Sequence, residues 1–180
     1  MNLLKHVSDT RGSVYSILLG VWAIVAIYAM AHDQYLVRIS PEHFTEFHEP
    51  LWGISDPGRL ALAYAFLASI SPGSCLGVAA WLVARTGPLP KLASKVVLWR
   101  AIGLVIAVEI VAVAIGLIAH RTHRPVFPES WYPDESPPLI VTQTIQIACY
   151  LFGFLFSGIY LTSLWIQRLG LRGCLRIPIH

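Results

Sequence analysis

Four long apolar runs constrain the fold of this chain more than any other feature of its sequence. They lie at about residues 14–31, 60–84, 96–119 and 139–166. A hydrocarbon core about 30 Å thick needs about 20 residues of helix, so the last three runs are ample and the first is close to the minimum. Because unpaired backbone groups are not tolerated in lipid, each run is expected to be a helix. The sequence therefore predicts one membrane domain with an all-α fold, a four-helix transmembrane bundle with short outer loops.

The composition argues against a soluble protein. Hydrophobic residues make up 56% of the chain and charged residues only 13%, whereas soluble domains carry about 25% charged residues. The net charge of +3 comes from basic residues in short loops, so it does not indicate nucleic-acid binding. The sequence has no phosphate-binding glycine loop and no nucleophile elbow. Any activity must therefore lie in the bundle or on its outer face.

The basic residues divide unevenly between the two sides of the membrane. One side is expected to hold nine of them: Lys5, Arg11, Arg85, Lys91, Lys95, Arg100, Arg168, Arg172 and Arg176. The other side is expected to hold four: Arg38, Arg59, Arg121 and Arg124. The positive-inside rule therefore predicts that both termini are cytoplasmic, with outer loops at 32–59 and 120–138.

The first apolar run has a second interpretation as a signal peptide. Ala29-Met30-Ala31 has the small-x-small form of a signal-peptidase site, and a basic segment and an apolar run precede it. Cleavage there would leave three spans and make His32 the N-terminus. Because the run is long for a signal peptide, we favour an uncleaved first helix.

The first outer loop is expected to contain a short surface helix. Ser40 has the features of an N-cap, and Pro41 stands at the first helical position. A helix over residues 43–49 would place Phe44 and Phe47 on an apolar edge. Such an edge suits the membrane surface or the end of the bundle.

Histidines are concentrated in the two outer loops, and a metal site is one use for them. His43 and His48 would lie about 140° apart on a regular helix, so they cannot chelate one ion from it. His32 and His120, in contrast, end the first and third spans on the same side. The candidate ligands for a divalent metal such as zinc, copper or iron are His32, Asp33, His48, His120 and His123. The alternative, which we favour, is that these side chains bind only loop backbone, water or lipid headgroups.

Glu109 is the most informative single residue, because an ionisable group deep in a span is costly and by default suggests a function. It lies ten residues from the expected outer end of the third helix, about 15 Å deep. Ser69, Gln146 and Tyr150 could surround a protonated Glu109 in a polar pocket open to the outside. The alternative is a neutral glutamic acid that only joins helices. Arg100 is expected to extend to the cytoplasmic surface rather than pair with Glu109.

The second span combines a helix breaker with small residues. Asp56-Pro57 has the capping pattern of a helix start. Further along, Pro72 removes a backbone donor, while Gly73 and Gly77 form a G-x-x-x-G face. Together these residues predict a kink with a close helix contact, and we interpret the pattern as a packing device.

The outer loop resembles that of an uncharacterised family of small multi-pass bacterial inner-membrane proteins, over about residues 28–85. Those proteins typically carry HDQ followed by S-x-E-Y-F-T and often H-P, and this chain has HDQ, SPEHF and FHEP. The matching positions are His32, Asp33, Gln34, Glu42, Phe44 and His48. The chain departs from the pattern at His43, where tyrosine is usual, and at Glu49, which separates His48 from Pro50. The resemblance implies a multi-pass membrane protein and supplies no substrate.

Two functions of different class are compatible with these features. The first, which we favour, is a non-enzymatic membrane component whose His- and acid-rich outer loop binds a ligand, a metal ion or a partner, either another membrane subunit or a second copy of the chain. The second is a small membrane oxidoreductase or transporter subunit that uses Glu109 and the outer histidines for proton, quinone or metal chemistry. Both imply contact with the lipid bilayer.

Overall fold

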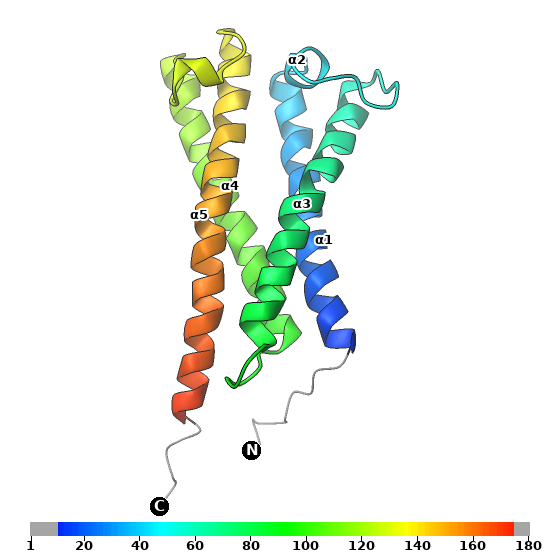
Figure 1. Ribbon diagram of the computed structural model, residues 1–180. Coiled ribbons are helices and arrows are strands. Elements are labelled where there is room, and N and C mark those ends of the chain that lie inside the picture. Colours follow the sequence, from blue (N-terminus) through cyan, green and yellow to red (C-terminus); the bar gives the residue numbers. More distant parts are fainter. Residues whose placement is uncertain (1–10, 175–180) are drawn as a thin grey trace, which may run out of the picture.

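The computed structural model describes residues 11–174. Within that range the chain forms an all-α bundle of four long helices and two short helical turns (Figure 1). The long helices are α1 (Arg11–Ile39), α3 (Pro57–Arg85), α4 (Ser94–Thr122) and α5 (Pro137–Cys174). Each of the four is long and apolar enough to cross a membrane. The predicted four-helix fold is confirmed, and the described chain fits a multi-pass membrane protein.

The two ends of the bundle differ in how the helices are joined. One end carries a single turn of helix, α2 (Glu42–Thr45), and a 3-10 turn, η1 (Glu129–Trp131); we term it the cap end. The opposite end carries the α3–α4 connection, residues 86–93, and we term it the connection end. Helix α1 begins and helix α5 ends at the connection end, as Figure 1 shows.

The first helix is longer than the sequence indicated. It was expected to end near residue 31, with the outer loop starting at 32, but it continues to Ile39. The reason is that the polar residues after Ala31 face the interior: His32 is 4% exposed and Asp33 6% exposed. Both residues are therefore helical and buried rather than part of an outer loop.

The short helix in the first outer loop is smaller than predicted. It covers only Glu42–Thr45, and the Ser40 hydroxyl donates to the Glu42 carboxylate (3.1 Å) instead of capping the helix. Phe44 is 2% exposed and packs against residues of α1, α3 and α5. Of the two positions expected for it, the membrane surface and the end of the bundle, it occupies the second. The Asp56 cap of α3 is confirmed, since its carboxylate accepts from the backbone N–H of Arg59 (2.8 Å).

The bundle consists of two helix pairs, α1 with α3 and α4 with α5. Helix α3 continues through Pro72, and the glycines that follow allow the predicted close contact. A Cβ built on Gly77 would lie 2.8 Å from the backbone oxygen of Leu18, and one on Gly73 would lie 3.2 Å from the Cα of Trp22. The G-x-x-x-G face therefore lies directly against the α1 backbone.

Substitution of Gly77 by alanine is expected to loosen the α1–α3 pair. The new methyl group would meet main-chain atoms of Leu18, which cannot rotate away, so α1 must shift. We expect a loss of about 1–3 kcal/mol in the free energy of unfolding, measured by denaturant unfolding in detergent. Gly158→Ala is the control, because a Cβ there has no neighbouring heavy atom within 4 Å. Equal stability of the two variants would contradict the close contact.

A buried arginine holds the connection end together. Arg168 of α5 is 0% exposed, and its guanidinium donates to four backbone carbonyls at the end of α3 and in the α3–α4 connection. These are the carbonyls of Val83, Thr86 (2.7 Å), Leu89 (2.9 Å) and Pro90 (2.8 Å). The carbonyls at a helix C-terminus lack partners within the helix. Arg168 therefore adds donors at the end of α3, where the backbone N–H of Leu92 also bonds to the Ala84 carbonyl. We term this arrangement the Arg168 clamp.

Candidate functional site

An ionisable pair joins the two halves of the bundle inside the membrane-spanning region. The ring Nδ1 of His32, on α1, lies 2.8 Å from Oε2 of Glu109, on α4. His32 is nearly fully buried, whereas the Glu109 side chain is 28% exposed. Glu109 precedes the last residue of α4 by thirteen positions, or about 20 Å of helix. We term these two residues the His32–Glu109 pair.

Tyrosines of α1 surround the pair because of their helical spacing. Tyr28 and Tyr35 lie four residues before and three after His32, so all three share one face of α1. Their ring centroids are 5.6 Å and 5.3 Å from that of His32. The Tyr28 hydroxyl donates to Oε2 of Glu109 (2.9 Å) and lies 3.2 Å from the Sγ of Cys149 on α5. The cluster therefore connects three of the four long helices.

This geometry suits the holding of a proton. One proton can occupy the 2.8 Å contact between Nδ1 and Oε2 whichever group carries it, and the phenol of Tyr28 stabilises the negative form of the acid. The other ring nitrogen of His32, Nε2, is buried with no hydrogen-bond partner among residues 11–174. Paired ionisable groups inside a span are typical of proton relays and of polar joints between helices.

The polar residues proposed from the sequence to surround Glu109 are engaged elsewhere. Ser69 is 2% exposed, and its hydroxyl donates to the carbonyl of Phe66 in its own helix (2.7 Å). The Gln146 amide donates to the hydroxyl of Tyr150 (2.8 Å). The hydrogen bonds of Glu109 go instead to Tyr28 and His32, which sequence reasoning did not connect with it. Their i, i+4 spacing was a signal, but it was hidden because the first helix was expected to end at residue 31.

Gln146 and Tyr150 contribute to a different cavity, at the cap end. It has a volume of about 420 Å³ and is formed by both outer connections and α5. Its lining residues are His43, Phe47, His48, Ser130, Trp131, Tyr132, Pro133, Gln143, Gln146 and Tyr150. We term it the cap cavity. It contains histidine, amide, hydroxyl and aromatic groups but none of the acids, lysines or arginines of the described chain.

The walls of the cap cavity are held by specific hydrogen bonds. Tyr132 ties the second connection to α5, because its hydroxyl lies 2.8 Å from Oγ1 of the buried Thr144. Gln143 donates to the carbonyl of Trp131 (3.1 Å). In the first connection, a ring nitrogen of His48 lies 2.6 Å from the carbonyl oxygen of His43. Both outer connections are therefore ordered parts of the cavity.

His43 has unused hydrogen-bonding capacity in this cavity. It is 4% exposed, and both of its ring nitrogens lack a partner among residues 11–174. The side-chain oxygen of Gln146, in the same lining, is also buried without a partner in that range. Buried polar atoms are nearly always hydrogen-bonded, so unpaired ones on residues that line a cavity indicate a place where a ligand can bind.

Burial keeps His43 neutral. Burial and, to a smaller extent, the nearby His48 together lower the pKa of His43 from 6.5 to about 4; the two ring centroids are 4.9 Å apart. At neutral pH the imidazole therefore has one donor and one acceptor nitrogen.

Acidification is expected to loosen the cap. A detached cap exposes His43, which then binds a proton near pH 6.5, whereas the docked cap binds one only near pH 4. The stabilisation from neutral His43 is complete above pH 6.5 and is lost as the pH falls toward 4. Between pH 7 and pH 5 we expect protection of residues 41–56 from hydrogen exchange, corrected for intrinsic rates, to fall roughly tenfold. His43→Phe should remove this dependence, and His120→Phe should keep it; a His43→Phe protein that still responds to pH would refute the explanation.

The five candidate metal ligands do not gather at one point. His32 pairs with Glu109, while the ring of His48 lies edge-on to that of His43 and tilted against that of Tyr64. His120 and His123 lie together near the end of α4, with ring centroids 6.2 Å apart, and both are exposed. Asp33 is buried in α1. Within residues 11–174, no three histidine, cysteine or acidic side chains form a group that could hold a metal ion.

Comparison of the chain with protein-family models, with curated proteins and with solved structures found no match. The functional argument therefore depends on the geometry of this chain alone.

Proposed function

We propose that the protein is a non-enzymatic, multi-pass membrane component that binds a small, uncharged polar ligand in the cap cavity. The observation that carries the proposal is His43, a buried side chain with two unpaired nitrogens in the lining. Neutral His43 offers a donor and an acceptor, and Gln146 offers a second acceptor. A neutral lining disfavours ions, and the rings of Trp131 and Tyr150 provide flat apolar surfaces.

The size of the cavity supports a small-molecule ligand. Its volume of about 420 Å³ falls within the range of about 300–1,000 Å³ that is usual for such sites. Ligand sites of this kind are largely apolar with a few fixed polar groups that set orientation. The cap cavity is more polar than this, because histidine, amide and hydroxyl groups stand beside the apolar rings of Phe47 and Trp131, and such a lining suits a polar ligand.

We further propose that the cap end lies outside the cytoplasm of a bacterial cell, in the inner membrane. The excess of basic residues at the connection end supports this orientation. The cap cavity would then receive its ligand from the periplasm.

The proposal is tested by ligand screening on detergent-purified protein. The panel is a monosaccharide, a nucleoside and an N-acetylated amino-acid amide, together with any small molecule that co-purifies. A ligand at 100 times its Kd should stabilise the wild-type protein by about 2.7 kcal/mol. His43→Phe and Gln146→Leu should each weaken it at least tenfold, while His120→Phe should not. Unchanged ligand affinity in both cavity variants would refute the assignment. So would the absence of binding by every panel compound and every co-purifying molecule.

The His32–Glu109 pair favours a second candidate function, a transporter subunit that couples a substrate to proton movement. The supporting observation is the 2.8 Å contact between two ionisable groups within the spans. Reconstituted vesicles carrying a pH-sensitive dye test this candidate. Glu109→Gln should abolish any protein-dependent proton flux, and a protein with no flux at all would leave the pair as a structural joint.

A further inference from the structure

A cationic side chain lies within the third span. Arg100, on α4, meets no carboxylate among residues 11–174. Its Nη1 donates to the backbone oxygen and the hydroxyl of Ser163 on α5, both at 2.9 Å. A guanidinium has five N–H donors, so these two bonds fix its orientation and leave the Nε–Nη2 edge available. That edge is the fork that binds phosphate in a bidentate manner.

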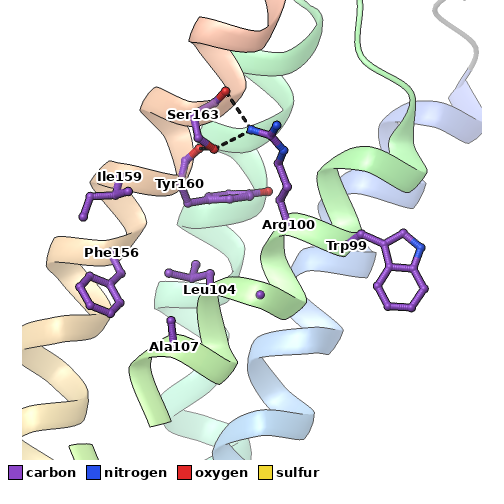
Figure 2. A pocket seen from close by; sticks show the side chains of 9 residues that line it. Trp99, Arg100, Leu104, Ala107, Phe156, Ile159, Tyr160 and Ser163 are labelled. Carbon is purple, nitrogen blue, oxygen red and sulfur yellow. Dashed lines mark hydrogen bonds between the residues drawn. The ribbon is translucent and has the colours of Figure 1, made fainter. Parts of the chain in front are cut away.

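The sequence led us to expect that Arg100 would extend toward the membrane surface and would not pair with Glu109. Figure 2 shows its side chain extending along α4 toward Ser163, which lies on the connection-end side of Tyr160. The hydrogen bonds to Ser163 hold the guanidinium at this position.

An apolar groove between α4 and α5 begins at Arg100. It has a volume of about 580 Å³, and Figure 2 shows Leu104 and Ala107 on one side and Phe156 and Ile159 on the other. A Cβ on Gly103, also in the lining, would meet no heavy atom within 4 Å, so space is open there. We term this the Arg100 groove.

The position of the groove matches that of a lipid. Arg100 is six residues, or about 9 Å, from the first residue of α4, and the groove continues about 10 Å deeper to Ala107. Its rim includes Trp99, which is 63% exposed. Arginine near a span end and tryptophan beside it are the residues expected at headgroup level.

We propose that the Arg100 groove binds one anionic phospholipid of the surrounding bilayer. The phosphodiester lies on the free edge of Arg100, and the first part of an acyl chain lies along Gly103 and Ala107 between the two helices. An unneutralised guanidinium bordered by apolar surface is costly in a membrane, and a lipid phosphate supplies the missing charge. This charge complementarity favours a lipid over a second copy of the chain. The inference is independent of the ligand proposed for the cap cavity.

The test is lipid binding to the full chain measured by native mass spectrometry. The probes are dioleoyl phosphatidylglycerol, dioleoyl phosphatidylcholine and glycerol phosphate. We expect one phosphatidylglycerol per chain to bind at least tenfold more tightly than phosphatidylcholine. Arg100→Gln should remove this preference. Arg172 is an exposed arginine of α5 near the connection end, and Arg172→Gln should retain the preference.

A second variant separates the acyl chain from the headgroup. Gly103→Leu fills part of the groove and keeps the charge of Arg100, and it should weaken phosphatidylglycerol binding at least tenfold. Equal affinity for the two lipids in the wild-type protein, or a preference that survives Arg100→Gln, would overturn the proposal. Glycerol phosphate that binds as tightly as the lipid would also overturn it, because it would indicate a site for phosphate alone. A dimer of the chain that excludes lipid from the groove would overturn it as well.

Discussion

Replacement of Arg168 by methionine is expected to destabilise the protein more than any other single substitution considered. The change leaves the carbonyls of Val83, Thr86, Leu89 and Pro90 without their donor; the bond to Leu89 is buried and the other three are partly buried. Each buried acceptor without a partner costs about 1–3 kcal/mol. Because the connection can partly rearrange, we expect a total loss of about 3–5 kcal/mol, below the simple sum.

The effect is measured as the midpoint of thermal unfolding in detergent. For a chain of this length, a loss of 3 kcal/mol corresponds to a fall of about 6–12 °C in Tm. Arg168→Lys keeps the charge but lacks the planar fork, so it should recover only part of the loss. Arg172→Met, at an exposed position, should stay close to the wild-type protein. An Arg168→Met protein within about 2 °C of wild type would show that the clamp contributes little.

The second large effect is expected at the His32–Glu109 pair, and it should be asymmetric. His32→Leu leaves an acid inside the spans with the Tyr28 hydroxyl as its remaining hydrogen-bond donor. Loss of a hydrogen-bond partner from a partly buried acid costs about 1–3 kcal/mol. Glu109→Leu removes the carboxyl group itself and leaves no acid at this place in the span, so its cost should be smaller. The double variant should cost less than the sum of the two, with a coupling energy of at least about 1 kcal/mol.

A double-mutant cycle by denaturant unfolding measures this coupling. Tyr15→Phe on the exposed part of α1 (60% exposed) combined with Glu109→Leu provides the uncoupled reference. Additive effects of His32→Leu and Glu109→Leu would mean that the contact does not stabilise the bundle.

Hydropathy was sufficient to predict the four spans and the fold class, because burial in lipid depends on the average of about 20 residues. Gly73 and Gly77 were also interpretable, since their spacing predicts a close helix contact whichever helix provides it. The end of α1 could not be predicted in this way. His32, Asp33 and Gln34 resemble the start of a polar loop, and only the position of α4 shows that they face a partner inside the bundle.

The candidate sites show the same limit. Glu109 was recognisable as a functional position from its depth alone, but its partners depend on which helices are neighbours. Tyr150 was associated with Glu109 because its estimated depth is similar, and Gln146 as a polar residue closer to the outer face. In the structure a hydrogen bond joins these two residues to each other, in the lining of the cap cavity. From the sequence, Arg168 was counted only as a basic residue that sets membrane topology. In the structure its side chain is 0% exposed and lies against the carbonyls of the α3–α4 connection.

The Arg168 clamp also determines an order of biogenesis. Both helix pairs consist of consecutive spans, so each can enter the membrane as a hairpin while synthesis proceeds from the N-terminus. The guanidinium that completes the α3–α4 connection, however, belongs to the last helix to leave the ribosome. Until α5 is inserted, the C-terminal end of α3 displays unsatisfied carbonyls, which marks a nascent or truncated chain as incomplete. Insertion of the final helix is therefore the step that completes the α3–α4 connection.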